Sequence, residues 1–124
     1  MTILEAINKI DSLKPNSYSQ PEKLGWLSNI ENRIHTEILK THEPVPEEAF
    51  VPFDESTPLD TVLTAPSPYD ELYIYWLAAQ IDMWNRETAS YNNSIIMFSN
   101  AYTDYANYYN REHRPVVKHI RYLA

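Results

Sequence analysis

The chain has 124 residues, no cysteine and a formal net charge of −7. This length suits one domain, and 44% hydrophobic residues are enough for a packed core and too many for intrinsic disorder. Without cysteine there is no disulfide framework, no thiolate nucleophile and no cysteine-ligated zinc. No apolar run approaches the ~20 residues of a membrane span, and the N-terminus lacks a signal-peptide layout, so we expect a soluble cytosolic protein.

Two helices are expected in the N-terminal part of the chain. The first has apolar residues at helical spacing and ends at Pro15; these residues are Ile3, Ile7, Ile10 and Leu13. The second is expected to begin at Ser19, because Glu22 follows three residues later and completes a capping box. Its buried stripe is expected to consist of Leu24, Leu27, Ile30 or Glu31, Ile34 and Ile38, and the helix is expected to end by His42.

Residues 43–67 form an acidic, proline-rich connection. The segment between His42 and Tyr69 holds six prolines and six carboxylates but no Lys or Arg. It is long for a compact domain, where most loops run roughly 4–6 residues. Two interpretations stay open: a solvated loop packed down by Phe50, Phe53 and Leu63, or an arm that lies over a neighbouring subunit.

A long helix is expected in the C-terminal part, with Ser67 as its cap and Pro68 at its first position. No Gly or Pro interrupts residues 69–114, and apolar or aromatic residues recur there every three or four positions, with Thr88 as the exception. This seam consists of Ile74, Leu77, Ile81, Trp84, Thr88, Tyr91, Ile95, Phe98, Tyr102, Tyr105 and Tyr109. It favours one long or gently kinked helix over a hairpin, and the expected place for a break is Asn92-Asn93.

The aromatic end of this seam has two interpretations. The rings are the end of the chain's own core, or they bind a partner. A helix of ~45 residues, ~68 Å long, outruns what two short helices cover, and phenols suit protein interfaces because the ring gives contact area and the hydroxyl finds a polar neighbour. We therefore expect an assembling protein, with a subunit or partner interface formed by Trp84, Tyr91, Phe98, Tyr102, Tyr105 and Tyr109.

The C-terminus differs from the rest in charge. Residues 1–109 carry 6 basic and 16 acidic residues, whereas residues 110–124 carry four basic residues against Glu112 alone. After Pro115 the sequence VVKHIRYLA is basic and rich in β-branched residues, so we expect an extended docking segment over 115–124, with a disordered terminus as the alternative. Residues 1–114 are then one all-α domain, in which two short N-terminal helices are expected to pack on the long C-terminal helix. Its acidic surface would repel nucleic acid.

The sequence carries no motif for catalysis or for cofactor binding. The single glycine, Gly25, excludes a phosphate-binding loop and a dinucleotide fingerprint. None of the four histidines follows a glutamate by three residues or pairs with another at four-residue spacing, so no helical metal site is indicated. We expect no enzyme, no cofactor, no metal site and no binding to a membrane.

Four stretches carry a resemblance to a known family. They are PYDELYIYWLAAQID, YNNSIIMFSNAY, YYNREHRP and the N-terminal AINKIDSLKPNSYSQPEKLGWLSNIENRIHTEI. Together they resemble a small protein of prophage structural gene clusters in Gram-positive bacteria, the head–tail connector of long-tailed bacteriophages. The resemblance covers most of the chain except the acidic connection.

The resemblance implies a helical adaptor that assembles into a ring, commonly twelvefold, in the neck of the virion after assembly in the host cytoplasm. The portal protein would lie on one side and a stopper or tail completion protein on the other. DNA would pass through the channel without sequence-specific binding, which suits an acidic body. Members of this family often grip the portal with a C-terminal segment, here Arg114, Val116, Val117, Lys118, Ile120, Arg121 and Tyr122.

A second hypothesis needs no phage. The same helices and the same aromatic seam would serve a bacterial dimerisation or scaffold module that acts in regulation. Portal and capsid genes beside this one would favour the adaptor, and their absence would favour the dimer.

Overall fold

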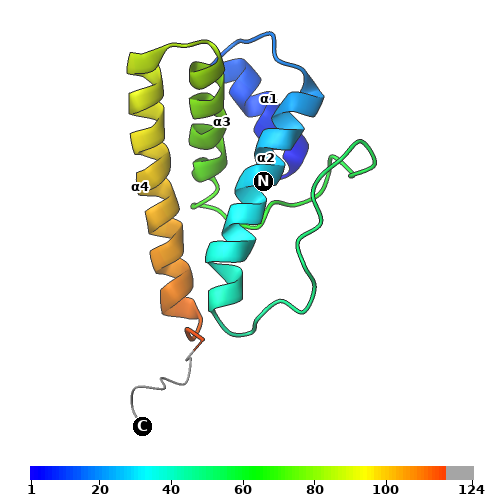
Figure 1. Ribbon diagram of the computed structural model, residues 1–124, viewed down its shortest axis with the longest axis vertical. Coiled ribbons are helices and arrows are strands. Elements are labelled where there is room, and N and C mark those ends of the chain that lie inside the picture. The colour runs from blue at the N-terminus through cyan, green and yellow to red at the C-terminus, as the bar shows by residue number, and fades with distance from the viewer. Residues whose placement is uncertain (117–124) are drawn as a thin grey trace.

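The computed structural model describes residues 1–116, which form a helical bundle. Its helices are α1 (Ile3–Leu13), α2 (Gln20–Glu37), α3 (Glu71–Trp84) and α4 (Thr88–Glu112), with a short 3-10 turn, η1 (Leu39–Thr41), after α2. Within these residues there is no β-strand, only two isolated bridges, so the predicted all-α class is confirmed for them. The helices α3 and α4 lie antiparallel side by side, and α1 and α2 pack against α3 (Figure 1).

Both N-terminal helices begin at side-chain caps. The Thr2 hydroxyl accepts from the Glu5 amide at 3.1 Å while the Glu5 carboxylate accepts from the Thr2 amide at 3.0 Å, which is a complete capping box. At α2 the Ser19 hydroxyl accepts from the Glu22 amide at 3.2 Å, which is one of the two hydrogen bonds of the predicted capping box. The apolar faces of these helices turn inward and form much of the core.

The prediction of one long C-terminal helix is wrong, and so is the predicted break at Asn92-Asn93. The chain reverses at Asn85-Arg86-Glu87, and the two halves of the seam pack on each other as α3 and α4. Asn92 and Asn93 lie exposed inside α4. A hairpin lets one half of the stripe bury the other, which a single rod of this length cannot do.

The break at residues 85–87 is a Schellman motif. The Glu87 amide donates to the Asp82 carbonyl at 2.9 Å and the Arg86 amide to the Met83 carbonyl at 3.1 Å, while Arg86 has a left-handed φ of 59°. This position of the motif usually holds glycine. Here it holds Arg86, so the sequence contains no glycine that would indicate the turn. The available signal was the run of polar residues from Asn85 to Glu87, together with Thr88 as the one polar member of the seam.

The third helix also begins later than Ser67-Pro68. Residues 67–70 form a turn in which the Tyr69 amide donates to the Pro66 carbonyl at 2.7 Å, and α3 starts at Glu71. In this turn the Tyr69 ring stacks on Tyr108 near the end of α4, with centroids 4.6 Å apart. The aromatic contact anchors the turn to α4.

The connection between η1 and α3 lies on the chain's own core. The amides of Ile3 and Leu4 donate to the carbonyls of Thr61 and Leu59, both at 3.0 Å, and Leu63 is buried at 3% exposure. The Phe53 amide donates to the Ser28 hydroxyl of α2 at 3.0 Å. These contacts correspond to the first of the two interpretations of this segment, a loop packed down on its own domain.

A buried carboxylate ties the connection to two helices. Glu31 of α2 is 5% exposed and accepts from the Thr64 amide at 3.0 Å, from the Thr64 hydroxyl at 2.8 Å and from the Tyr73 hydroxyl of α3. The Tyr73 oxygen in turn accepts from the Ala65 amide at 2.8 Å. Burial raises the pKa of Glu31, and the hydrogen bonds from Tyr73 and Thr64 hold back part of that rise.

Candidate functional site

The structure separates the six predicted interface residues into three groups. Phe98 and Tyr105 are buried in the core, at 2% and 1% exposure. Tyr91, Tyr102 and Tyr109 are half-buried, and Trp84 is exposed. The premise that other copies must cover this stripe is therefore wrong for its buried members, because the α3–α4 hairpin and the turn before it cover them. Of the six, Trp84 presents the most surface to a partner.

The half-buried Tyr102 shows why this seam uses phenols. Its hydroxyl donates to the Glu37 carboxylate of α2 at 2.7 Å, and the Arg33 guanidinium lies 4.6 Å from its ring centroid. The hydrogen bond from Tyr102, with that from Arg33, lowers the pKa of Glu37, and burial raises the pKa of Tyr102. A leucine would fill space but could not reach α2 with a polar group, so the phenol joins α4 to α2.

The end of α4 is held by stacked rings. Tyr109 stacks on His113 with centroids 3.7 Å apart and meets the edge of His42 at 5.2 Å. His42 also binds the Ile38 carbonyl at 2.8 Å and the Asn110 side-chain oxygen at 3.1 Å. These contacts fix the point at which the chain leaves α4 for its C-terminal segment.

Two residues of the predicted docking tail fall within the described part. The Glu43 amide donates to the Arg114 carbonyl at 2.7 Å, and the Val116 amide donates to the Thr41 carbonyl at 2.9 Å. The tail therefore begins as an antiparallel bridge along residues 41–43. The remaining predicted tail residues, Val117, Lys118, Ile120, Arg121 and Tyr122, lie outside the described residues.

Buried charge elsewhere has a structural role. Asp82 of α3 has no exposed surface; it is paired with the Lys14 ammonium that follows α1 and accepts from the Ser94 hydroxyl of α4 at 2.8 Å. Its two partners tie the end of α1 and the first turns of α4 to α3. Among residues 1–116, no three His, Asp or Glu side chains are grouped closely enough to hold a metal ion.

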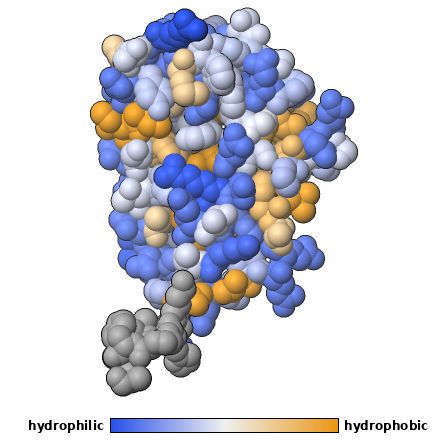
Figure 2. Space-filling view, viewed as in Figure 1, coloured by the Kyte–Doolittle hydropathy of each residue, from blue (hydrophilic) through white to orange (hydrophobic). Residues whose placement is uncertain are grey.

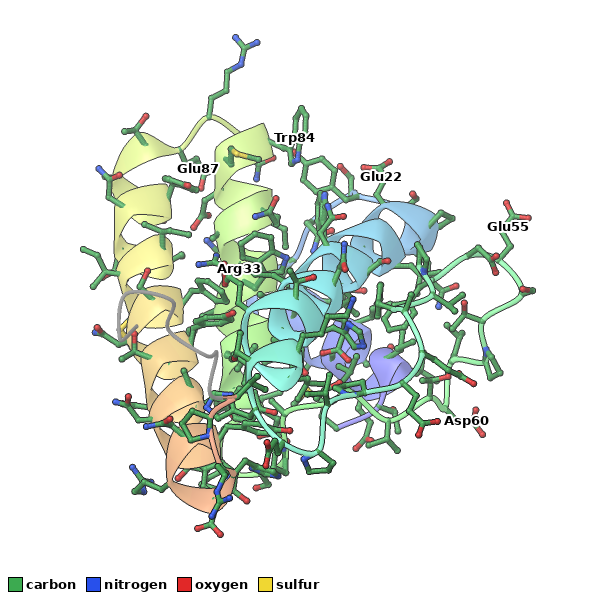
Figure 3. The ribbon with its side chains drawn as sticks, turned by 60° about the horizontal axis from the view of Figure 1, so that its bottom comes forward. Glu22, Arg33, Glu55, Asp60, Trp84 and Glu87 are labelled. Atoms are coloured by element: carbon green, nitrogen blue, oxygen red, sulfur yellow. The ribbon has the colours of Figure 1, made fainter. Side chains whose placement is uncertain are left out.

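Two of the open concave surfaces lie on either side of the first turns of α2. One, the Trp84 groove, has a volume of about 410 Å³ and is lined by Tyr18, Pro21, Glu22, Gly25, Trp26, Asn29 and Trp84. The Tyr18 and Trp26 rings meet edge to face, with centroids 5.4 Å apart. Figure 3 shows Glu22 and Trp84 close together at one end of the molecule, on α2 and α3.

The other cavity, the Phe53 groove, has a volume of about 340 Å³ between α2 and the connection. Its apolar residues are Leu24, Phe53 and Leu59, and its rim carries Asp54 and Glu55. Hydrogen bonds from the Ser56 hydroxyl and amide lower the pKa of Asp54, so this carboxylate stays ionised at neutral pH. In Figure 3 Glu55 projects outward from the connection.

Sequence reasoning missed these grooves. Trp84 of α3 joins Tyr18 and Trp26 in one groove, and Phe53 of the connection joins Leu24 in the other, only through tertiary contacts that periodicity does not report. One signal was present: Gly25 is the only glycine of the chain, it lies inside a predicted helix, and it precedes a tryptophan.

Comparison with family models, with curated proteins and with solved structures finds no match to this chain. Among the described helices, none combines the length and the apolar character that a membrane span requires. What the arrangement offers chemically is surface for binding: exposed rings and carboxylates on the described body, in a chain whose sequence ends in a basic segment.

Proposed function

We propose that this chain is a structural adaptor, a head–tail connector that forms a ring between the portal and the tail-side stopper in the neck of a long-tailed bacteriophage. The observation that supports this most is the division of the chain into an acidic body with exposed aromatic grooves and a basic terminal segment that leaves the body at the opposite end of α4 from Trp84. A subunit with complementary surfaces at two ends is suited to repeated assembly.

The charge of the body fits the same role. The described body carries 16 acidic against 6 basic residues over positions 1–109, and a channel lined by such surface lets DNA slide because like charges repel. The proposal assigns no catalytic step to the buried carboxylates, since Glu31 and Asp82 are occupied by hydrogen bonds within the fold.

Co-expression with the portal protein of the same gene cluster tests the proposal. We expect this chain to co-purify with the portal and to form rings on it in electron micrographs. Replacing Arg114, Lys118 and Arg121 by Glu should abolish co-purification while leaving the helical circular dichroism unchanged. Recovery of portal free of this chain at micromolar concentrations of both would contradict the adaptor function.

A second candidate, a helical dimerisation or scaffold module, is favoured by apolar surface on α4. Ile96 and Met97 are 58% and 40% exposed, and Figure 2 shows a hydrophobic patch over the upper part of α4. An isologous dimer through this face predicts that Ile96→Gln, with Met97→Gln, gives monomers, and that salt has little effect on the dimer. The adaptor predicts that this double variant still binds portal.

A further inference from the structure

Gly25 has no role within its own domain that explains the absence of a side chain. It lies inside α2, where glycine is a poor helix former. A Cβ atom built there would meet nothing within 4 Å, so the fold has room for any residue. The chain uses glycine nowhere else. Bare backbone at this one site suits the close approach of another chain.

The surface around Gly25 is continuous and acidic. Gly25 and Pro21 line both the Trp84 groove and the Phe53 groove, so the two grooves meet across α2. Rings and aliphatic side chains form their walls, whereas Glu22, Asp54 and Glu55 carry charge at their rims and no Lys or Arg lines either one. This surface is complementary to an extended segment that carries both basic and apolar side chains.

Residues 117–124 have this chemistry. The sequence VKHIRYLA contains Lys118 and Arg121, four large apolar or aromatic side chains and no acidic residue.

Residues 117–124 are too few to reach the grooves of their own chain and also to fill them. Val116 is held to Thr41 by a hydrogen bond of 2.9 Å, and Gly25 lies 12 residues before the end of α2. That is about 18 Å of helix, to which η1 adds about 6 Å. Eight residues span at most about 29 Å fully extended, which leaves one or two residues at Gly25. A segment that fills both grooves must come from another copy.

We propose that residues 117–124 of one copy dock across Gly25 of a second copy, into the Trp84 and Phe53 grooves. The contact is head-to-tail, because the donor surface and the acceptor surface are different parts of the chain, and such contacts generate rings or open chains. The proposal does not depend on the phage assignment, since both partners are this chain. In an assembled neck, a portal that binds the same segment would compete with the neighbouring copy.

Complementation between two variants tests this contact. Gly25→Gln blocks the acceptor surface and keeps the tail, whereas Lys118→Glu with Arg121→Glu reverses the tail charge and keeps the grooves. Asn32→Gln places the same side chain on an exposed position of α2 outside both grooves and is the matched control. The full chains are compared by sedimentation velocity at low ionic strength, with circular dichroism and melting temperature as checks of folding.

We expect wild type and Asn32→Gln to associate, and each blocking variant to associate at least about tenfold more weakly. An equimolar mixture of the two variants should form one-to-one pairs that do not grow further, because one intact tail then meets one intact acceptor. Trp84→Ser is a second acceptor variant, for use if Gly25→Gln lowers the melting temperature. Three results would each overturn the proposal. Either variant alone could associate as strongly as wild type, the mixture of the two variants could stay monomeric, or the wild-type protein could itself be monomeric.

Discussion

Replacing Tyr73 by Phe tests the buried network that joins α2, α3 and the connection. The substitution keeps the ring and removes only the hydroxyl, so it opens no cavity larger than one oxygen atom. That hydroxyl donates to Glu31 and accepts from the Ala65 amide at 2.8 Å. Tyr73 and Ala65 have no exposed surface, so water does not replace the lost partner.

Removing the Tyr73 hydroxyl lowers the free energy of unfolding in two ways. A hydrogen bond to a charged group contributes about 1.5–3 kcal/mol, and a buried amide without an acceptor costs about 1–3 kcal/mol. We expect Tyr73→Phe to lower the free energy of unfolding by about 3 kcal/mol, the lower part of the combined range, because partial relaxation offsets some of it. Against a typical total of about 5–15 kcal/mol, the variant should fold but with a large loss.

The loss should depend on pH. The Glu31 pKa is raised by burial, so the contribution of this group is fully present below its unfolded-state pKa and declines as pH rises through the folded-state value. The Tyr73 hydroxyl stabilises the ionised carboxylate and limits this decline. Tyr73→Phe should therefore lower the free energy of unfolding more at pH values above the folded-state pKa of Glu31 than at pH values below it.

Urea unfolding followed by circular dichroism measures both effects at a series of pH values. Tyr75→Phe is the matched control, because Tyr75 is a half-buried tyrosine of the same helix whose hydroxyl makes no hydrogen bond among residues 1–116. A loss below about 1 kcal/mol, equal to that of the control, would refute the reasoning. So would a loss that does not change with pH.

Three further substitutions test other parts of the fold by thermal and urea unfolding. Arg86→Gly should stabilise the protein by about 0.5–1 kcal/mol because it relieves the left-handed φ, whereas Arg86→Ala, which keeps a Cβ, should not. Gly25→Ala should stabilise it by about 1 kcal/mol, since the added methyl meets open space in a helix; a loss of stability would contradict this. Asp82→Ala should destabilise it by about 3 kcal/mol, while Asp104→Ala on the exposed face of α4 should change little; equal effects would exclude a role for the buried pair.

The parts of the fold that the sequence predicted are those set by local signals. Helical spacing and the cap at Ser19 placed α1 and α2, because capping and amphipathic periodicity act within a few residues. The all-helical class followed from the same patterns.

The parts that the sequence did not predict depend on tertiary contacts. The chain reverses at Arg86, which adopts a left-handed φ and is flanked by two backbone hydrogen bonds. Because this residue is not glycine, no typical turn residue indicated the reversal. Glu31 looked like a member of a helical stripe, and only its contacts with Thr64 and Tyr73 make it a buried tie. The grooves beside Gly25 arise from segments far apart in the chain. The sequence identified the apolar and aromatic residues of the seam, but not that α3 and α4 fold back on each other and bury much of it.

The central claim is that this chain is an assembly subunit with complementary acidic and basic surfaces. The most direct measurement is the mass of the purified full-length protein in solution across a concentration series, at low and at high ionic strength. The account predicts multiples of the monomer mass that increase with concentration and decline with added salt, because the contact depends on Lys118 and Arg121. A single monomeric species at every concentration and at both ionic strengths would contradict it.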